Sequence, residues 1–506
     1  MQIDPTKFQV ETHTAPIWEQ EQTFQEIMAE QLRHAPWLML SMVIHGIAIA
    51  IFLLMPPTIT LLDDKALIMA PPDEEEIIEE EEEPEEEPEE EEPEEPVLTE
   101  VELTEEEITE EETFEEEETE SAFNSDQWNT AIGLGGGAAG KFGGRGGGRG
   151  KLGKGSGRAT ARAIELGLEW LKKHQDEDGK WDADDFMKHD TDGTPCDGVG
   201  NPVHDIGLTG LALLAFLGDG STMRSGAYKD VVKKAVMWLR KEQDPDTGLF
   251  GSNTSHDFLY DHSIAALAMV EAYGLSNSKL LKKYAQKGIN YLESHRNPYM
   301  VWRYQPRDND NDTSVTGWCV MAYKSAQDFK LQVNEQATKL SATWFDSVTD
   351  PVSGRCGYQK RGEPSSRQHG DHTTRFPPEK GEALTAVGLL CRFFLGQNPK
   401  DSPVMTAAAD TLLSKPPNWD DKTGDIDHYY WYYATYALYQ MGGRHWKDWS
   451  KKLTPAVVKT QREDGNFKGS WDAIGAWGED GGRVYSTATL VLTLEAYYRY
   501  TRVFVR

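Results

Sequence analysis

A unit of two helices recurs through the chain from about residue 159 to residue 506. In each unit an amphipathic outer helix precedes a turn rich in glycine and aromatic residues, and an inner helix of small and apolar residues follows. A helix that is apolar on most faces must be covered on both sides, and a period of this length is typical of repeat folds. Outer helices are expected to begin near Thr160, Tyr228, Ser278, Asn334, Ser402 and Trp446, and inner helices near Asp205, Asp261, Asp312, Lys380, Asp427 and Val484. Six such pairs predict an all-α fold, a closed α6/α6 toroid over residues 159–506.

The turns that join outer to inner helices share a glutamine, a glycine and an aromatic residue. Glycine permits the positive backbone angle that often follows a helix. We expect the aromatic ring to pack across the joint and the glutamine amide to cap the neighbouring helix. The three clearest copies are Gln175, Gly179 and Trp181; Gln243, Gly248 and Phe250; and Gln461, Gly465 and Phe467.

These turns resemble the QW motifs of the squalene cyclase and protein prenyltransferase repeat superfamily. The stretches 312–318, 428–435 and 482–488 are similar to repeat-containing membrane proteins of planctomycete-type bacteria. The resemblance implies a terpenoid cyclase-like toroid. It leaves the function open, because toroids of this kind serve as lyases, thioester domains and binding modules.

Residues 37–55 form an apolar stretch that is long enough to span a bilayer as a helix. Ser41 and His45 lie four residues apart in it and would share one helix face. An ionisable side chain inside a membrane is costly and usually functional; the alternative is that His45 is a tolerated polar residue. The preceding segment, residues 1–36, is acidic and not basic, which favours a cytoplasmic segment and an anchor over a signal peptide.

The same stretch resembles the N-terminal anchor of TonB-family energy transducers, through Pro36-Trp37 and then Ser41, His45 and Gly46. The resemblance implies that Ser41 and His45 couple the chain to a proton-driven ExbB/ExbD-like motor. It also implies a single-pass protein of the inner membrane with the toroid in the periplasm. The likeness does not extend to a TonB-like terminal domain, so import through an outer-membrane receptor is not implied.

Two segments of biased composition separate the anchor from the toroid. Residues 56–131 form an acidic, Glu/Pro-rich spacer, which is expected to be extended and disordered. The chain has 85 acidic and 51 basic residues; 31 of the acids lie in residues 73–120, so the remainder is nearly neutral. Residues 132–158 are Gly-rich and basic, and we interpret them as a linker. A solubilising or calcium-buffering tail and an RNA-binding tail are the respective alternatives, but no basic nucleic-acid face is evident.

Acidic residues and histidines gather at the expected starts of the inner helices. Because these starts converge at one rim of a toroid, they predict an Asp/His-lined mouth above an aromatic wall, the default site for a lipid, glycan or protein ligand. Each aspartate taken alone is most simply an N-cap. The predicted binding residues are His204, Asp205, Asp261, His262, Trp318, Tyr429, Trp431 and Tyr432.

The acid of class II terpene cyclases, an Asp-x-Asp-Asp motif, is not intact where the resemblance would place it. Residues 182–185 match by letters but lie away from an inner-helix start, and Asn311 stands at the acid position before Asp312. Asp312, Asp427 and His428 remain as candidates for catalysis. A binding or interaction module is therefore favoured, and an enzyme acting on a lipid or glycan is the alternative.

No cofactor is expected from the sequence. The inner-helix histidines have no Asp-x-Cys pair beside them, which argues against a prenyltransferase-like zinc site. Asp308, Asp310 and Asp312, and likewise Asp190 and Asp192, have the alternating spacing of calcium loops, so structural calcium stays open. Four cysteines in so long a chain do not make a disulfide framework.

Overall fold

The computed structural model describes residues 156–499, except residues 192, 277 and 369. The predicted anchor at 37–55, with Ser41 and His45, lies outside the described residues, as do the acidic spacer and nearly all of the basic linker. Within the described part, no helix combines the length and the apolar character that crossing a membrane requires.

Helices account for the regular structure of the described part, where the only strand-type pairings are two isolated bridges, Gln243 with Phe250 and Thr349 with Cys356. The inner helices are α4 (Asp205–Gly218), α6 (Phe258–Ser276), α8 (Thr313–Asp328), α11 (Ala383–Phe394), α13 (His428–Met441) and α15 (Gly478–Leu494). The outer helices are α3 (Ser156–Lys173), α5 (Lys229–Lys241), α7 (Lys279–His295), α9 (Glu335–Val348), α12 (Pro403–Leu413) and α14 (Gly443–Val458). Short helices lie between them: η4 (Phe186–His189), η5 (Pro202–His204), α10 (Asp371–Arg375), η6 (Pro378–Lys380), η7 (Gly465–Phe467) and α16 (Ala496–Arg499).

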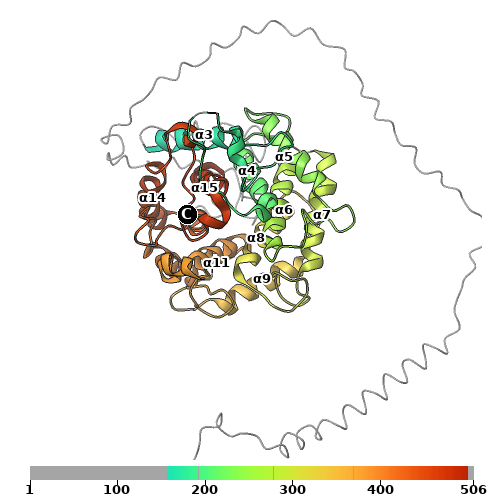
Figure 1. Cartoon of the computed structure of the whole chain (residues 1–506). Helices are drawn as coiled ribbons and strands as arrows, with labels where there is room; N and C mark the ends of the chain where they lie inside the picture. Colours follow the sequence, from blue (N-terminus) through green and yellow to red (C-terminus); the bar gives the residue numbers. More distant parts are fainter. Residues whose placement is uncertain (1–155, 192, 277, 369, 500–506) are drawn as a thin grey trace, which may run out of the picture. The chain divides into compact units, whose positions relative to one another are not determined.

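The inner helices close into a ring. Each packs against the next in the order α4, α6, α8, α11, α13 and α15, and α15 packs back against α4. Each outer helix covers the inner helices beside it, and α14 contacts α3, so the outer layer also joins its two ends. Figure 1 shows the two concentric layers. The predicted closed all-α toroid is therefore confirmed for the described residues.

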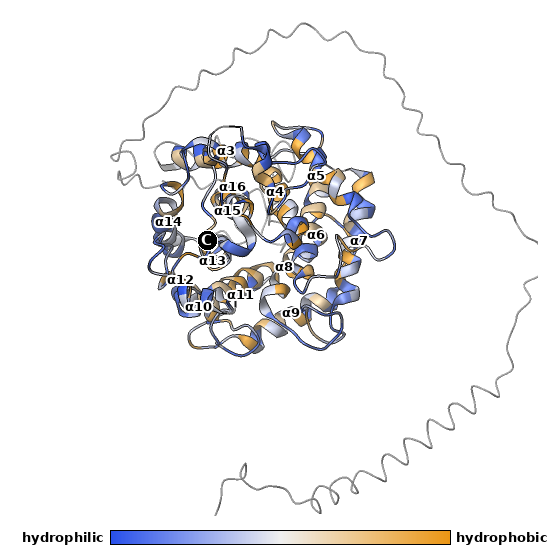
Figure 2. Cartoon of the chain, viewed as in Figure 1, coloured by the Kyte–Doolittle hydropathy of each residue, from blue (hydrophilic) through white to orange (hydrophobic). Residues whose placement is uncertain are grey.

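The two layers follow from the distribution of apolar residues. On α5, Val232, Val236 and Leu239 are buried while Lys233 and Lys234 are exposed, which is the pattern of a helix covered on one side only. On α6, by contrast, buried residues run without a break from Asp261 to Ala272. Figure 2 shows the resulting mixture of polar and apolar residues on the outer helices. Each large apolar side chain that becomes fully buried contributes about 1.5–3 kcal/mol.

The glutamines of the turns cross-link neighbouring repeats. The amide of Gln175 donates to the main-chain oxygen of Gly179 at 2.9 Å and to that of Val231 in α5 at 3.0 Å. The amide of Gln243 donates to Gly248 and to Tyr284 in α7, both at 3.0 Å. The amide thus reaches the next outer helix, as expected, but at a carbonyl within that helix and not at its end.

Tryptophans of the turns cap the outer helices instead. The indole N–H of Trp181 donates to Leu171 at 2.7 Å, that of Trp302 donates to Leu292 at 2.7 Å, and that of Trp471 donates to the oxygen of Val457 at 2.8 Å. These acceptors lie in the last turns of α3, α7 and α14. Each of them also accepts from a main-chain N–H three or four residues later, so the indole adds a second bond at the helix end. All three tryptophans are 1% exposed or less.

The last copy of the motif is built differently from the sequence prediction. The amide of Gln461 donates to the oxygen of Gly469 at 2.9 Å, and Gly469 has φ +97°. Gly465 is exposed at the start of η7, and Phe467 is buried beneath the guanidinium of Arg462, 4.3 Å from its ring centre. The prediction of Gly465 and Phe467 was therefore wrong: Gly469 and Trp471 take these places. The shift arises because the turn is longer, with glycine eight residues after the glutamine instead of four.

Candidate functional site at the start of the inner helices

An acidic residue with a cationic partner lies at the start of every inner helix. The pairs are Asp205 with Lys180 (2.7 Å), Asp261 with His204 (3.1 Å), Asp312 with Arg303 (3.6 Å), Glu382 with Arg355, Asp427 with Arg367 (3.0 Å) and Asp480 with His204 (3.3 Å). Carboxylates are stabilised at helix N-termini by the helix dipole. Four of these acids were predicted from the sequence, but Glu382 and Asp480 were not. Asp480 was missed because the last inner helix was expected to start at Val484. Gly482 has non-helical angles within α15, which explains that misplacement.

Two of the predicted aspartates hold local structure. Asp205 accepts a hydrogen bond of 2.9 Å from the main chain of Ala183 and so fixes the first turn. Asp427 is 1% exposed and caps α13 by accepting from the N–H of Tyr430 at 2.9 Å. Burial raises the pKa of Asp427, although Arg367 opposes this. The contact of Asp427 agrees with the capping interpretation, whereas Asp205 binds the preceding loop and does not cap α4.

His204 joins the two inner helices that flank α4. Its Nδ1 lies 3.1 Å from Asp261 in α6, and its Nε2 lies 3.3 Å from Asp480 in α15. Burial opposes a charge on this ring, but hydrogen bonds to the two carboxylates outweigh burial and raise the pKa of His204 to about 10. His204 is therefore an imidazolium at neutral pH and bridges α6 and α15.

The other two predicted histidines do not line a mouth. His262 is 0% exposed; its Nδ1 accepts from the N–H of Phe250 at 3.0 Å, and its Nε2 donates to the oxygen of Gly288 at 3.1 Å. His428 is 2% exposed and stacks on Trp419 at 5.2 Å. Burial lowers the pKa of both histidines to about 3. They are neutral core residues, and both nitrogens of His262 are occupied by main-chain groups.

The predicted aromatic wall is a plug in the centre of the ring. Trp318 of α8 stacks on Tyr432 of α13 at 5.8 Å and meets Tyr433 edge to face at 5.4 Å. Trp318 and Tyr432 are 5% and 2% exposed, so side chains fill the ring at this level. Trp431 is 0% exposed and contacts Trp419 and His428. Of the predicted aromatic residues, Tyr429 alone is partly exposed.

Asp312 has the most unusual environment of the rim acids. It is 0% exposed, and its Oδ1 caps α8 by accepting from the N–H of Val315 at 2.8 Å. Its Oδ2 accepts from the hydroxyl of Tyr358 at 3.2 Å, and this hydroxyl lies 2.8 Å from that of Tyr304. Burial raises the pKa of Asp312 to about 7, against the opposing effects of its hydrogen bonds and Arg303. This carboxyl can exchange a proton near neutral pH.

Four partly exposed tyrosines from separate elements surround Asp312, and we call these five residues the tyrosine cluster. They are Tyr260 of α6, Tyr304 and Tyr358 of two turns, and Tyr429 of α13. The rings of Tyr260 and Tyr304 lie 6.1 Å apart. Burial raises the pKa of all four hydroxyls, and the charge of Asp312 raises it further. Sequence analysis named Asp312 and Tyr429; the other three come together only through the fold.

The spacing of Asp308, Asp310 and Asp312 does not produce a shared set of carboxylates. Asp308 accepts from the main-chain N–H of Asp310 at 2.9 Å, and the Asp310 carboxylate pairs with Arg303. The Asp312 carboxylate is buried against Tyr358. Arg303 thus lies beside both Asp310 and Asp312, while Asp308 is engaged by the main chain.

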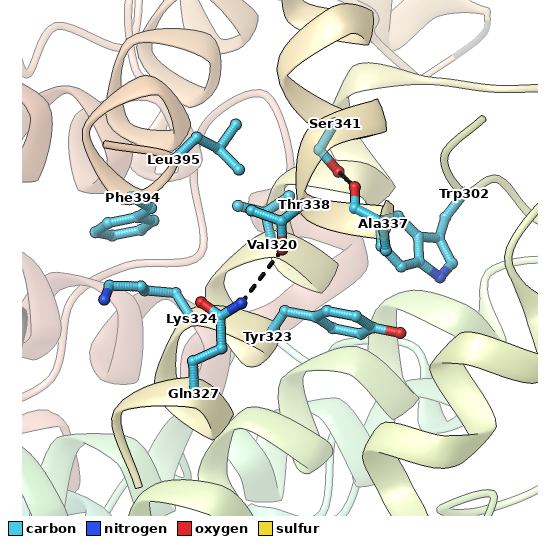
Figure 3. A pocket seen from close by; sticks show the side chains of 10 residues that line it. All are labelled: Trp302, Val320, Tyr323, Lys324, Gln327, Ala337, Thr338, Ser341, Phe394 and Leu395. Atoms are coloured by element: carbon cyan, nitrogen blue, oxygen red, sulfur yellow. Dashed lines mark hydrogen bonds between the residues drawn. The ribbon is translucent and has the colours of Figure 1, made fainter. Parts of the chain in front are cut away.

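A small pocket lies elsewhere, between α8, α9 and α11 (Figure 3). In it Gln327 donates to the hydroxyl of Thr338 at 3.3 Å, and Lys324 pairs with Asp328 at 2.7 Å. Lys324 follows Asp312 by twelve residues, which corresponds to about 18 Å along a helix. The pocket is therefore not part of the tyrosine cluster. Its lining consists of Trp302, Val320, Tyr323, Lys324, Gln327, Ala337, Thr338, Ser341, Phe394 and Leu395.

No protein-family model and no curated protein matches the chain. The chain is similar to several solved structures. A cellobiose 2-epimerase from Bacillus thermoamylovorans is 14% identical with a TM-score of 0.45, over 67% of this chain and 98% of that one. An inactive variant of an α-1,6-mannanase of Salegentibacter, in complex with α-1,6-mannotriose, is 11% identical with a TM-score of 0.44, over the same shares. A variant of the type II terpene cyclase MstE from Scytonema is 14% identical with a TM-score of 0.42, over 68% of this chain and 98% of that one.

Proposed function

We propose that the chain is a membrane-anchored, extracytoplasmic binding protein that takes its ligand at the tyrosine cluster. The observation that carries the proposal is the second oxygen of Asp312. Capping of α8 uses Oδ1 alone. Oδ2 instead accepts from Tyr358, whose hydroxyl contacts that of Tyr304. This chain of polar groups runs from a buried carboxyl to two partly exposed tyrosines.

The cluster favours an uncharged ligand rich in hydroxyl groups, such as a glycan. Tyrosine rings supply apolar faces, and their hydroxyls donate and accept hydrogen bonds. The acids at the rim already have cationic partners, so no strong excess of either charge remains to select an ion. The plug of Trp318 and Tyr432 limits the depth of the site, which suits a ligand that lies across the rim.

The test is binding of cell-wall glycan fragments to the full-length protein in detergent, measured by calorimetry. Tyr358→Phe removes only the hydroxyl beside Asp312 and is expected to weaken binding by roughly tenfold, the effect of one lost hydrogen bond. The matched control is Tyr299→Phe, since Tyr299 is 82% exposed. Equal affinities for the wild type and Tyr358→Phe would place the ligand elsewhere.

An enzyme is the second candidate, and the raised pKa of Asp312 is the observation that favours it. A carboxyl that titrates near neutral pH can serve as a general acid or base toward a glycan or lipid. Asp312→Asn keeps the N-cap acceptor and removes the proton. In assays of glycan and lipid extracts, product formed by the wild type and by Tyr299→Phe but not by Asp312→Asn would favour catalysis. Binding without turnover would favour the first candidate.

The anchor completes the proposal. As a helix, the apolar stretch 37–55 would place Ser41 and His45 on one face, where they would contact ExbB/ExbD-like motor subunits in the inner membrane, with the toroid in the periplasm. Full-length protein should co-purify with such subunits, and His45→Ala should lose them. Met42→Ala is the matched control, because it changes an apolar residue of the same stretch and leaves the serine–histidine pair intact. Absence of motor subunits from both preparations would contradict motor coupling but leave ligand binding intact.

A further inference from the structure

A histidine, an aspartate and a cysteine converge where α3 ends and the following loop begins. The ligand atoms of His174, Asp190 and Cys196 all lie within 4.8 Å of one another. His174 and Cys196 are 2% and 5% exposed, and the Asp190 side chain is 6% exposed. No rim acid and no residue of the tyrosine cluster belongs to this group.

The hydrogen bonds of His174 leave room for a cation. Its Nδ1 lies 2.7 Å from the main-chain oxygen of Trp170 and so must carry a proton. In the neutral ring Nε2 then has a lone pair, yet it lies 3.0 Å from Oδ1 of Asp190, which is also an acceptor. Two acceptors this close require a shared proton or metal ion.

The remaining atoms are oriented as a metal site requires. The Trp170 carbonyl fixes the His174 ring in the way that outer hydrogen bonds hold zinc ligands. Oδ2 of Asp190 accepts from the N–H of Cys196 at 2.6 Å, which leaves Oδ1 for a metal. Zinc binds N and O at about 2.0 Å and S at about 2.3 Å, so tetrahedral ligands lie roughly 3.3–3.8 Å apart. One carboxylate and one thiolate would neutralise Zn²⁺, as burial demands.

We propose that His174, Asp190 and Cys196 bind a zinc ion through Nε2, Oδ1 and Sγ, with water at the fourth position. On binding, the thiol proton of Cys196 passes to solvent and the sulfur coordinates as thiolate. Mixed nitrogen, oxygen and sulfur ligands of this kind suit zinc better than magnesium or calcium. The site is separate from the inner-helix histidines considered in the sequence.

The zinc ion would hold the loop that joins the first repeat to the last. We call its described residues, 190, 191 and 193–201, the clasp loop. Gly198 of this loop accepts from the N–H of Arg483 in α15 at 2.7 Å. The N–H of Asn201 donates to Asp480 at 2.8 Å, and the amide of Asn466 donates to Thr194 at 3.0 Å. The first repeat thus holds the last repeat through the clasp loop, whose base is the proposed metal site.

The test is zinc content of the full-length protein after incubation with zinc and dialysis, measured by mass spectrometry. The wild type should retain one zinc per chain, and Cys196→Ser and His174→Gln should lose it. Cys391→Ser, which alters an equally buried thiol beside Gly317, should retain it. Wild-type protein without bound zinc, or Cys196→Ser with as much zinc as the wild type, would overturn the proposal.

A second measurement does not depend on the folding of a variant. Cobalt(II) added to the wild type should give the intense absorption of a cysteine thiolate–cobalt bond and the visible bands of tetrahedral cobalt, and zinc should abolish both. Removal of zinc should increase tryptic cleavage at Lys188, which precedes the clasp loop. A cobalt spectrum without the thiolate band would exclude Cys196 as a ligand and so overturn the proposed site.

Discussion

The amide of Gln461 donates a hydrogen bond of 2.8 Å to the main-chain oxygen of Ala163, which precedes it by 298 residues. The same amide holds its own turn through Gly469. Gln175 and Gln243 each make the same two hydrogen bonds, one within their own turn and one to the outer helix that follows in the chain. For Gln461 the next outer helix around the ring is α3, at the other end of the domain. The same contact that joins neighbouring repeats therefore also joins the last repeat to the first and closes the toroid.

Loss of this amide should destabilise the closed ring. Gln461→Ala removes both hydrogen bonds, and its free energy of unfolding should fall by about 1–3 kcal/mol. The measurement is the urea midpoint of the full-length protein in detergent. The exposed Gln336 provides the matched control, because Gln336→Ala should shift the midpoint little. Equal shifts for the two variants would show that Gln461 is not specifically required.

The revised position of the last motif can be tested with two glycines. A Cβ at Gly469 would overlap the main-chain oxygen of Leu166, and φ is +97° there. A Cβ at Gly465 would meet nothing within 4 Å. Gly465→Ala should therefore cost only about 1–2 kcal/mol, for its positive φ, and Gly469→Ala should cost more than about 3 kcal/mol. Thermal unfolding would measure both, and the reverse order would restore Gly465 as the motif glycine.

Asp312 should make stability fall as the pH rises. Its folded pKa of about 7 lies above the usual 3.8, so the unfolded chain loses the proton first. Unfolding then releases a proton between about pH 4 and 7, and stability falls across this window by up to about 1.4 kcal/mol per pH unit. Asp312→Asn should remove this dependence while keeping the N-cap. Parallel curves of wild type and Asp312→Asn from about pH 5 to 8 would show an ordinary pKa for Asp312.

His204 should remain protonated at about pH 8. Its pKa is raised to about 10 because it lies between Asp261 and Asp480. The stabilisation of the folded protein by these ion pairs is fully present below pH 6.5, the pKa of histidine in the unfolded chain. It is lost as the pH rises through the pKa of the folded state. Selective ¹³C labelling of the histidines, with His204→Gln to assign the resonance, would report the charge by NMR. A titration midpoint near 6.5 would show that the carboxylates do not hold the proton.

The helices and their alternation were predictable because the apolar residues of each helix follow the pattern of its own burial. The outer helices carry one apolar stripe, as α5 does, and the inner helices are apolar on most faces, as α6 is. These patterns predicted both layers of the toroid. The capping role of Asp427 was equally local, since it depends on the N–H of Tyr430 three residues later.

The partners of the histidines, by contrast, could not be predicted from local sequence patterns. His262 and His428 stand beside rim acids in the sequence, but a helical residue one position further on points about 100° away. His262 consequently faces Phe250 and Gly288, and the sequence contains no sign of those partners. His204 precedes its helix and instead reaches two carboxylates, one of them 276 residues later at Asp480.

By itself, the sequence determined the helices, their order and four of the six acids at the starts of inner helices, because each depends on residues within a few turns. The tertiary structure decided the plug of Trp318 and Tyr432, the tyrosines around Asp312 and the meeting of His174 with Cys196. Each of these arrangements joins residues through ring closure or loop packing. Such contacts depend on the direction of every side chain at once, which no local pattern of residues specifies.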